Sequence, residues 1–334
     1  MGLFLDLFFQ ILPLYFVIGL GYIAGKYLQV QRESIAPLLL YIVVPVVTFK
    51  GILESDINPQ TLTYPLYFLC LGVFMSLSFF SLGRIFGFSK EKAGMLSLCT
   101  SLVNVGYYGL PLVLLVLGEE ALGISVMLIL GLAIHECTVA YLVAASGKYS
   151  FKESLKKTFT LPILYSSLIA IGVNYFHKLY FVDFLSHVPN SIQESVIFPT
   201  LSSIDVMMER FTGAYSLLGM IMIGLGISKL KKIELDLGFM SLAYFAKFIV
   251  IPAIALGFIY LNTNYLHFYD SLAIQVIFLM SLVPIGANTI TIATQLKLDV
   301  DKVAITTVIS TLLALAYIPL VLNLVSQSSF AASW

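Results

Sequence analysis

The chain has 334 residues, of which 59% are hydrophobic and only 11% are charged, and its formal net charge is zero. Soluble domains carry about 25% charged residues, so this composition, with a mean hydropathy of +0.98, excludes an ordinary soluble fold and indicates a polytopic membrane protein. The balanced charge also disfavours nucleic acid as a partner.

Apolar runs long enough to cross a bilayer recur along the whole chain. The first run lacks a basic leader and a small-residue cleavage site, so we expect a retained helix. A membrane helix needs about twenty apolar residues. On this basis the sequence predicts ten spans, at 3–25, 35–53, 63–86, 93–117, 121–146, 161–182, 212–229, 238–261, 268–296 and 302–325. The fourth and ninth run longer, as expected for helices with an unwound middle.

The basic residues fall in alternate loops. Fourteen of the 18 Lys and Arg residues lie in every second loop, whereas the remaining loops are mainly acidic or neutral. Because Lys and Arg gather on the cytoplasmic side of membrane proteins, both termini are predicted to be extracytoplasmic, and we expect a multi-pass protein of the plasma membrane that contacts the lipid bilayer.

A polar, basic stretch at 147–160 divides the spans into five and five. An odd number of spans in each half makes the second half insert upside down relative to the first. We therefore predict a first five-helix repeat over 1–146, a cytoplasmic linker over 147–160 and a second, inverted five-helix repeat over 161–326. The stretch 183–211 is interpreted either as a short interfacial helix with a kinked loop or as an ordinary outer loop.

Two of the long spans contain clusters of Gly, Pro and Asn, at Ser101–Pro111 (SLVNVGYYGLP) and at Ser281–Thr291 (SLVPIGANTIT). A broken helix in lipid leaves costly unpaired backbone groups unless protein or a wet cavity receives them, and paired breaks in two halves point to the central site of a transporter. Half-helix ends also carry partial charges that can hold an ion. The alternative is a pair of ordinary proline kinks. The predicted substrate-binding residues here are Asn104, Tyr107, Tyr108, Gly109, Pro111, Pro284, Asn288 and Thr289.

Further candidates lie in other spans. Pro45 and Thr48 of the second span could flank a substrate passage. Intramembrane charges are costly and usually functional, which singles out His135 and Glu136 in the fifth span and Lys247 in the eighth. Glu136 and Lys247 have opposite charges at comparable depth. They are interpreted either as a charge-linked or proton-linked site, or as a static salt bridge or a snorkelling lysine.

Enzyme motifs are missing from the sequence. It contains no Gly-rich phosphate loop, no HExxH and no GxSxG, and its four histidines have no metal-ligand spacing. The three cysteines lie in apolar segments and are interpreted as small buried hydrophobic residues. The sequence thus predicts a non-enzymatic protein without a cofactor or metal, and transport, if present, would use a gradient.

Five stretches together resemble the auxin efflux carrier family, which includes plant auxin carriers and bacterial malate permease-like proteins. The resemblance rests on Ile11–Gly25, Tyr41–Phe49, Asn104–Pro111, Gly224–Ser228 and Val283–Asn288. The last of these stretches continues into Leu298–Ala304. They cover nearly the whole chain in the family's order, and the Asn-x-Gly-x-x-Gly-x-Pro stretch is the most specific. The large central hydrophilic loop of the plant carriers is absent here.

This resemblance implies an all-α fold of the bile-acid-symporter and sodium/proton-antiporter type, with ten transmembrane helices. Helices 1, 2, 6 and 7 would form a scaffold, and helices 3–5 and 8–10 a mobile transport unit, with broken helices 4 and 9 crossing at the substrate site. By analogy, an elevator-like movement and a homodimer are expected. Asn104 and Pro111 match the first crossover, while Pro284 and Asn288 match the second.

The sequence and the resemblance together predict a secondary carrier that moves a small organic anion, such as a malate-like or auxin-like carboxylate, by alternating access. One alternative is a cation-coupled symporter for a different solute. Another is a membrane sensor that keeps this fold without transporting.

Overall fold

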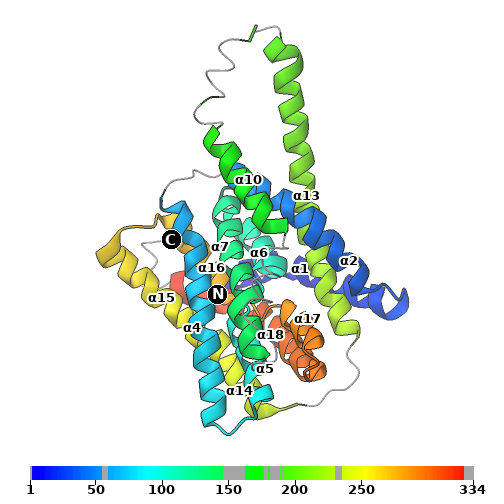
Figure 1. The fold of residues 1–334 in the computed structure, drawn as a ribbon, viewed down its shortest axis with the longest axis vertical. Helices are drawn as coiled ribbons and strands as arrows, with labels where there is room; N and C mark the ends of the chain where they lie inside the picture. Colours follow the sequence, from blue (N-terminus) through cyan, green and yellow to red (C-terminus); the bar gives the residue numbers. More distant parts are fainter. Residues whose placement is uncertain are drawn as a thin grey trace.

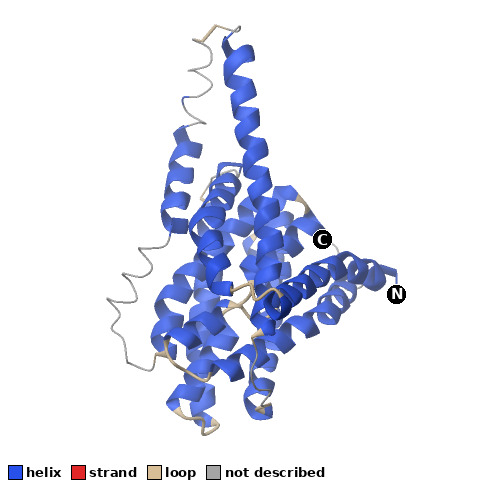
Figure 2. Cartoon of the chain, turned by 90° about the vertical axis from the view of Figure 1, so that its right-hand side faces the viewer, coloured by secondary structure: helices blue, strands red, loops and turns tan. Residues whose placement is uncertain are grey.

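The structure, a computed structural model, describes residues 2–54, 59–145, 162–176, 180, 188–189, 192–229 and 235–326. In these ranges every regular element is helical, and the helices form one bundle (Figures 1 and 2). Seven of the described helices are long and apolar enough to cross a membrane: Phe4–Tyr27, Ser34–Glu54, Thr61–Ile85, Glu119–Ala144, Gln193–Ser228, Leu237–Leu266 and Val300–Ser326. The shorter apolar helices are Val105–Leu117, Pro162–Phe176 and Ser271–Leu282. The expected all-helical, multi-pass class is therefore confirmed for the described residues.

The elements of the first half follow one another with few connecting residues. They are α1 (Gly2–Tyr27), α2 (Arg32–Leu38), η1 (Leu39–Val43), α3 (Val44–Glu54), η2 (Thr61–Thr63), α4 (Tyr64–Ile85), α5 (Lys90–Ser101), η3 (Val105–Gly109), α6 (Leu110–Leu117), η4 (Glu119–Ala121), α7 (Leu122–His135), η5 (Glu136–Ala140) and α8 (Tyr141–Ala144).

The described residues of the second half are also arranged as a series of helices. Its described elements are α10 (Pro162–Phe176), η7 (Gln193–Ile197), α13 (Phe198–Ser228), α14 (Leu237–Phe245), η8 (Ala246–Val250), α15 (Ile251–Leu261), η9 (Asn262–Leu266), α16 (Ser271–Leu282), α17 (Asn288–Gln295) and α18 (Val300–Ser326). The predicted linker at 147–160 lies outside the described residues.

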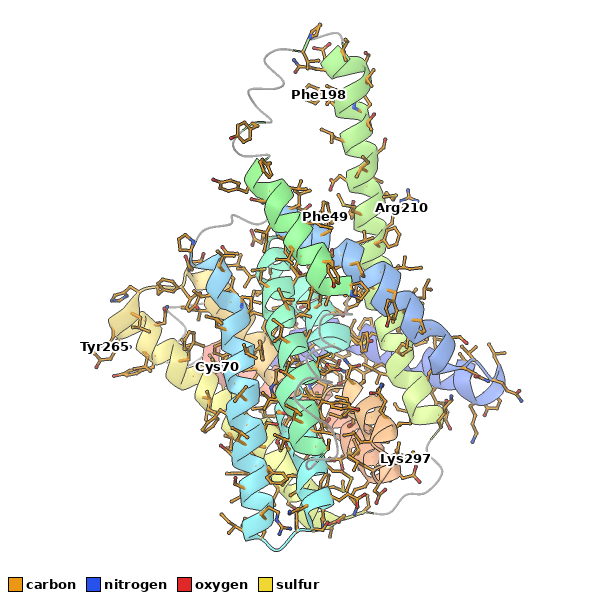
Figure 3. All side chains as sticks on the ribbon, in the orientation of Figure 1. Phe49, Cys70, Phe198, Arg210, Tyr265 and Lys297 are labelled. Carbon is orange, nitrogen blue, oxygen red and sulfur yellow. The ribbon has the colours of Figure 1, made fainter. Side chains whose placement is uncertain are left out.

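The seventh predicted span differs most from the structure. It was expected at 212–229, but η7 and α13 form one continuous helix over Gln193–Ser228. The interfacial helix and kinked loop predicted within 183–211 are therefore wrong from residue 192 onward, while most of 183–191 lies outside the described residues. Figure 3 shows Phe198 and Arg210 on the part of α13 that extends beyond the bundle, with Lys297 toward the other end.

Four prolines stand directly after π-helical turns. Pro45, Pro111, Pro199 and Pro252 each occupy the second position of an α-helix that follows η1, η3, η7 or η8. Proline lacks an N–H and its ring clashes with the carbonyl one turn back, and the wider π turn accommodates both defects. These prolines therefore sit within continuing helices rather than at breaks.

Small residues allow a close contact between two long helices. α1 packs chiefly against α13, and a Cβ atom on Gly224 would lie 2.0 Å from the Ile18 carbonyl oxygen. A Cβ atom on Gly21 would lie 2.3 Å from the Ile221 carbonyl oxygen. Such small residues let helix backbones approach closely in membranes, so this pair depends on glycine at both positions.

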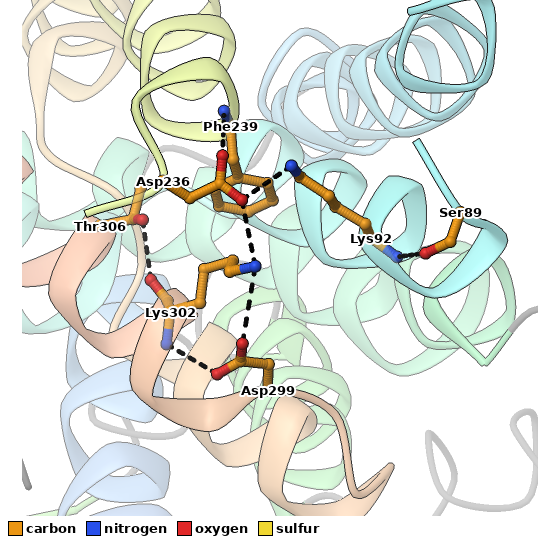
Figure 4. A network of polar contacts seen from close by, with 7 residues as sticks. All are labelled: Ser89, Lys92, Asp236, Phe239, Asp299, Lys302 and Thr306. Carbon is orange, nitrogen blue, oxygen red and sulfur yellow. Dashed lines mark hydrogen bonds and ion pairs between the residues drawn. The ribbon is translucent and has the colours of Figure 1, made fainter. Parts of the chain in front are cut away.

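Three helix N-termini meet around Asp236 (Figure 4). Asp236 caps α14 by accepting a hydrogen bond from the Phe239 N–H at 3.1 Å, and its other oxygen lies 2.7 Å from Lys92 Nζ and 3.1 Å from Lys302 Nζ. Lys92 belongs to α5 and Lys302 to α18, so a single carboxylate joins three helices. Burial acts to raise the pKa of Asp236, but the hydrogen bonds from Lys92, Phe239 and Lys302 outweigh it and lower that pKa to about 2.

We expect the Gly224→Ala variant to be less stable by about 1–3 kcal/mol, because the added methyl overlaps the α1 backbone. Gly226→Ala, on the same helix, is the matched control, since a Cβ there meets nothing within 4 Å. The control should be neutral or slightly stabilised, because alanine favours a helix by about 1 kcal/mol over glycine. Thermal melting of the purified variants in detergent measures both, and equal melting temperatures would contradict the proposed close contact.

The charge of Asp236 should stabilise the fold above its ordinary pKa, and that contribution should disappear as pH falls toward about 2. At neutral pH we expect Asp236→Asn, which keeps a capping oxygen, to cost about 1 kcal/mol. Molar salt should shrink the difference, because it shortens the screening length to about 3 Å. Glu91→Gln, an exposed carboxylate beside Lys92, is the control. Melting that is equally salt-sensitive in Asp236→Asn and wild type would refute the ionic contribution.

Candidate functional site

Two helices are interrupted near the centre of the bundle. The first interruption separates α5, which ends at Ser101, from η3, which begins at Val105. The second separates α16, which ends at Leu282, from α17, which begins at Asn288. The sequence predicted a break within Ser101–Pro111, where Pro111 was the strongest helix-breaking residue. The structure moves it to residues 102–104, because Pro111 follows a π turn within continuing helix.

The two interruptions pair with each other. Val103 and Ile285 form an antiparallel bridge, in which the Asn104 N–H donates to the Pro284 carbonyl at 2.9 Å and the Gly286 N–H donates to the Leu102 carbonyl at 2.8 Å. The Ile285 N–H donates to Ser310 Oγ at 3.1 Å. Each interruption thus supplies the hydrogen-bond partners that the other lost.

The side chain of Asn104 is left as a buried donor. Its backbone carbonyl accepts from the Tyr108 and Gly109 N–H groups, but its Nδ2 has no hydrogen-bond partner among the described residues, and the residue is only 4% exposed. A buried polar group without a partner carries a free-energy cost. A ligand atom that accepts a hydrogen bond would remove this cost.

A cavity of about 390 Å³ lies against the paired interruptions. Its wall includes the first turns of η3 and α17, so the N-terminal ends of two half-helices face it, and such ends carry partial positive charge. The described residues of the wall are Ala36, Tyr41, Val44, Leu102, Val103, Asn104, Val105, Gly106, Tyr107, Ile129, Leu132, Ala133, Glu136, Cys137, Tyr141, Pro162, Ile163, Tyr215, Met222, Gly286, Ala287, Asn288, Thr291, Ile292 and Gln295.

Glu136 is the one charged side chain among those wall residues. Its Oε2 accepts a hydrogen bond from Asn288 Nδ2 at 3.1 Å, which joins η5 to the first residue of α17. The neighbouring His135 turns away: it is fully buried, and a Cβ on Gly72 of α4 would lie 2.5 Å from its ring. Both His135 ring nitrogens lack a partner among the described residues.

Lys247 lies at the C-terminal end of α16, away from the two N-terminal ends at the cavity. It is fully buried, and its Nζ donates to the Ser281 carbonyl at 3.0 Å, where α16 ends and partial negative charge collects. Among the described residues, Lys247 forms no ion pair with Glu136. The sequence-based pairing of these two residues is therefore not what the structure shows.

Tyrosines connect the interrupted segment to α1 and α13. The hydroxyls of Tyr15 and Tyr108 lie 3.0 Å apart, and Tyr15 also donates to the Thr311 carbonyl of α18 at 2.5 Å. The Tyr107 and Tyr215 rings lie 6.1 Å apart, and a Cβ on Gly106 would come within 2.6 Å of the Tyr215 hydroxyl. These contacts hold α1 and α13 against η3.

The structure brings four of the predicted site residues to the cavity wall: Asn104, Tyr107, Glu136 and Asn288. The others take structural positions outside the wall. Thr289 is fully buried and bonds to Gly286 and Thr307, and Pro284 takes part in the pairing only through its carbonyl, which accepts from the Asn104 N–H. The remaining predicted residues that do not line the cavity are Pro45, Thr48, Tyr108, Gly109, Pro111, His135 and Lys247.

Sequence reasoning missed several wall residues from other helices. Tyr41, Tyr141 and Tyr215 each add an aromatic ring with a hydroxyl, and Met222 and Ile163 add apolar surface. An apolar or aromatic residue in a membrane helix gives no local signal of function. The polar Thr291 and Gln295, one and two turns beyond Asn288, were the signals available.

Comparisons with known proteins agree with this architecture. Residues 6–155 match the family model described as membrane transport protein, and residues 215–333 match the sodium bile acid symporter family. An uncharacterized transporter of Methanocaldococcus jannaschii is 26% identical over 310 residues, which cover 90% of this chain and 92% of that protein. These families point to a membrane transporter rather than an enzyme. The first half of the chain is therefore similar to the membrane transport protein family and the second half to the bile acid symporters, in agreement with the resemblance seen in its sequence.

Proposed function

We propose that the protein is a secondary carrier of small organic anions of the carboxylate type, malate-like or auxin-like, across the plasma membrane. The observation that carries this proposal is the convergence at one cavity of two half-helix N-termini with the unpartnered amide donor of Asn104. A carboxylate would accept from that amide and from backbone N–H groups without a buried cation. The volume of about 390 Å³ lies in the range of small-molecule sites.

The proposal includes ten transmembrane helices in two inverted five-helix repeats. It is supported by the described helices, which overlap each of the ten predicted spans although the seventh helix begins earlier, at Gln193, and by the two interruptions, each in the fourth predicted span of its half. α1 packs on α13 and α3 on α10, while α4 packs on α5 and α7, as expected for a scaffold and a separate transport unit. Alternating access would then move one group of helices past the other.

The present conformation fits a state that is open to the cytoplasm. Ala36, Tyr141, Pro162 and Gln295 of the cavity wall all lie near loops rich in Lys and Arg, which the positive-inside rule assigns to the cytoplasm. The contacts of Tyr15 with Tyr108 and Thr311 bind the scaffold to the crossover. The substrate would enter this cavity from the cytoplasmic side.

A sodium-coupled symporter is the second candidate, favoured by the family match over residues 215–333. Replacing external sodium with choline during transport separates the two. A sodium-coupled protein would lose uptake in choline, whereas the carrier proposed above would retain it.

We expect proteoliposomes loaded with unlabelled malate or indole-3-acetate to accumulate the corresponding labelled anion by counterflow. Asn104→Ala should reduce this counterflow by about 10- to 100-fold, the value of a hydrogen bond to a charged group. Asn264→Ala, an exposed asparagine on η9, is the matched control and should transport like wild type. If neither anion shows counterflow, or if Asn104→Ala keeps the full rate, the proposed substrate class or site is wrong.

Cys137 provides a test of the cavity and its orientation, because it lines the wall while Cys99 is fully buried and Cys70 lies on the outer surface of the bundle. In a Cys70→Ala background, a charged, membrane-impermeant thiol reagent should modify Cys137 from the cytoplasmic side and leave Cys99 unmodified. Cys137→Ala should abolish the modification. Labelling only from the outside would reverse the proposed orientation.

A further inference from the structure

The inference concerns the carboxyl group in the cavity and rests on the function proposed above. We propose that Glu136 takes up one proton together with each organic anion, so that transport is coupled to a proton gradient. In this step a proton from the aqueous side joins a carboxylate oxygen of Glu136 as the anion enters. Both leave on the other side of the membrane, and the carboxylate is restored.

The geometry places Glu136 and the anion site in competition for the same positive helix end. Glu136 Oε2 accepts from the side chain of Asn288 at 3.1 Å, and Asn288 begins α17, whose N-terminus faces the cavity. Without an anion, the carboxylate faces this end itself. A second negative charge in the same cavity would repel it, because charges in a partly enclosed protein site interact at a lower effective dielectric constant than in bulk water. Neutralising Glu136 with a proton removes that repulsion.

The surroundings of Glu136 contain no described cation that could replace the proton. The cavity wall contributes neutral groups around it, and the charged residues of α4 and α5, which pack against η5, lie at the ends of those helices. Lys247 is already bonded to the Ser281 carbonyl, and His135 faces α4. The titratable groups of the cavity wall other than Glu136 are Tyr41, Tyr107, Cys137, Tyr141 and Tyr215.

Asn288 can bond to Glu136 in both of its protonation states. An amide N–H can donate to a carboxylate and, more weakly, to the carbonyl oxygen of a carboxylic acid, so the Glu136 side chain can stay in place in both protonation states. The protonated form gains an O–H donor that can turn toward the anion. Proton and anion therefore stabilise each other's binding, which is positive coupling between two sites.

The test uses full-length protein in proteoliposomes, labelled malate and a membrane potential held at zero. With one proton per anion, a gradient of one pH unit should concentrate malate about tenfold, since one unit is a factor of ten in proton activity. Glu136→Gln should lose this accumulation, and whatever counterflow it retains should no longer depend on pH. Glu136→Asp should retain it in part, and the exposed Glu120→Gln control should retain it fully.

A second readout needs no substrate. Infrared difference spectra of wild-type protein between about pH 6 and about pH 8, the range in which a coupling carboxyl group must exchange its proton, should show a carboxylic acid band that Glu136→Gln lacks. The inference is overturned if the band is absent, if Glu136→Gln still concentrates malate, or if wild type shows counterflow without gradient-driven accumulation. Absence of malate counterflow in wild type would instead count against the proposed function, and the infrared band then decides the protonation alone.

Discussion

Backbone hydrogen bonding in a medium without water is the constraint on which the rest of this structure depends. In lipid, each unpaired N–H or C=O group costs several kcal/mol, so a helix can stop at mid-membrane only where another group replaces its lost bonds. Here the replacements are reciprocal, through Asn104 with Pro284 and Gly286 with Leu102. Neither interruption would be stable alone, and the pairing therefore joins the two halves of the chain at the centre.

The pairing also determines the charge that the centre presents. Stopping a helix produces one positive and one negative end. The negative end of α16 is occupied by Lys247 at the Ser281 carbonyl, whereas the positive ends of η3 and α17 face the cavity. The molecule thus covers the negative end of α16 with its own side chain and leaves these positive ends facing the cavity. Glu136 lies beside the α17 end through its hydrogen bond from Asn288.

The sequence could predict the interruptions because Gly, Pro and Asn together are incompatible with lipid-exposed helix. Composition located them within a few residues, but it could not identify which residue breaks the helix. Pro111 looked decisive, yet a π turn absorbs its missing N–H, and the extended backbone lies at residues 102–104. The same effect explains Pro45, Pro199 and Pro252, where the sequence alone cannot separate a π turn from a break.

Orientation around a helix limited the prediction of the site in a different way. His135 and Glu136 are adjacent, and successive helical residues point about 100° apart, so a shift of one residue decides which of them reaches the cavity. The structure turns Glu136 inward and His135 against Gly72. Tyr215 and Met222 come from α13, and their place in the wall depends on how α13 packs on η3, which is a tertiary property without a local signal.

Both halves of the chain form the site, so neither half alone determines its specificity. The two halves match differently described families, but Asn104 comes from the first and Asn288 from the second, and the wall adds Tyr41 and Tyr215 from helices outside the interruptions. The polar groups that would hold a carboxylate lie at the crossover, whereas the aromatic rings lie around it. Under the proposed function, recognition of the anion's charge would follow from the backbone pairing, whereas the choice among anions would depend on how η1 and α13 pack around the cavity.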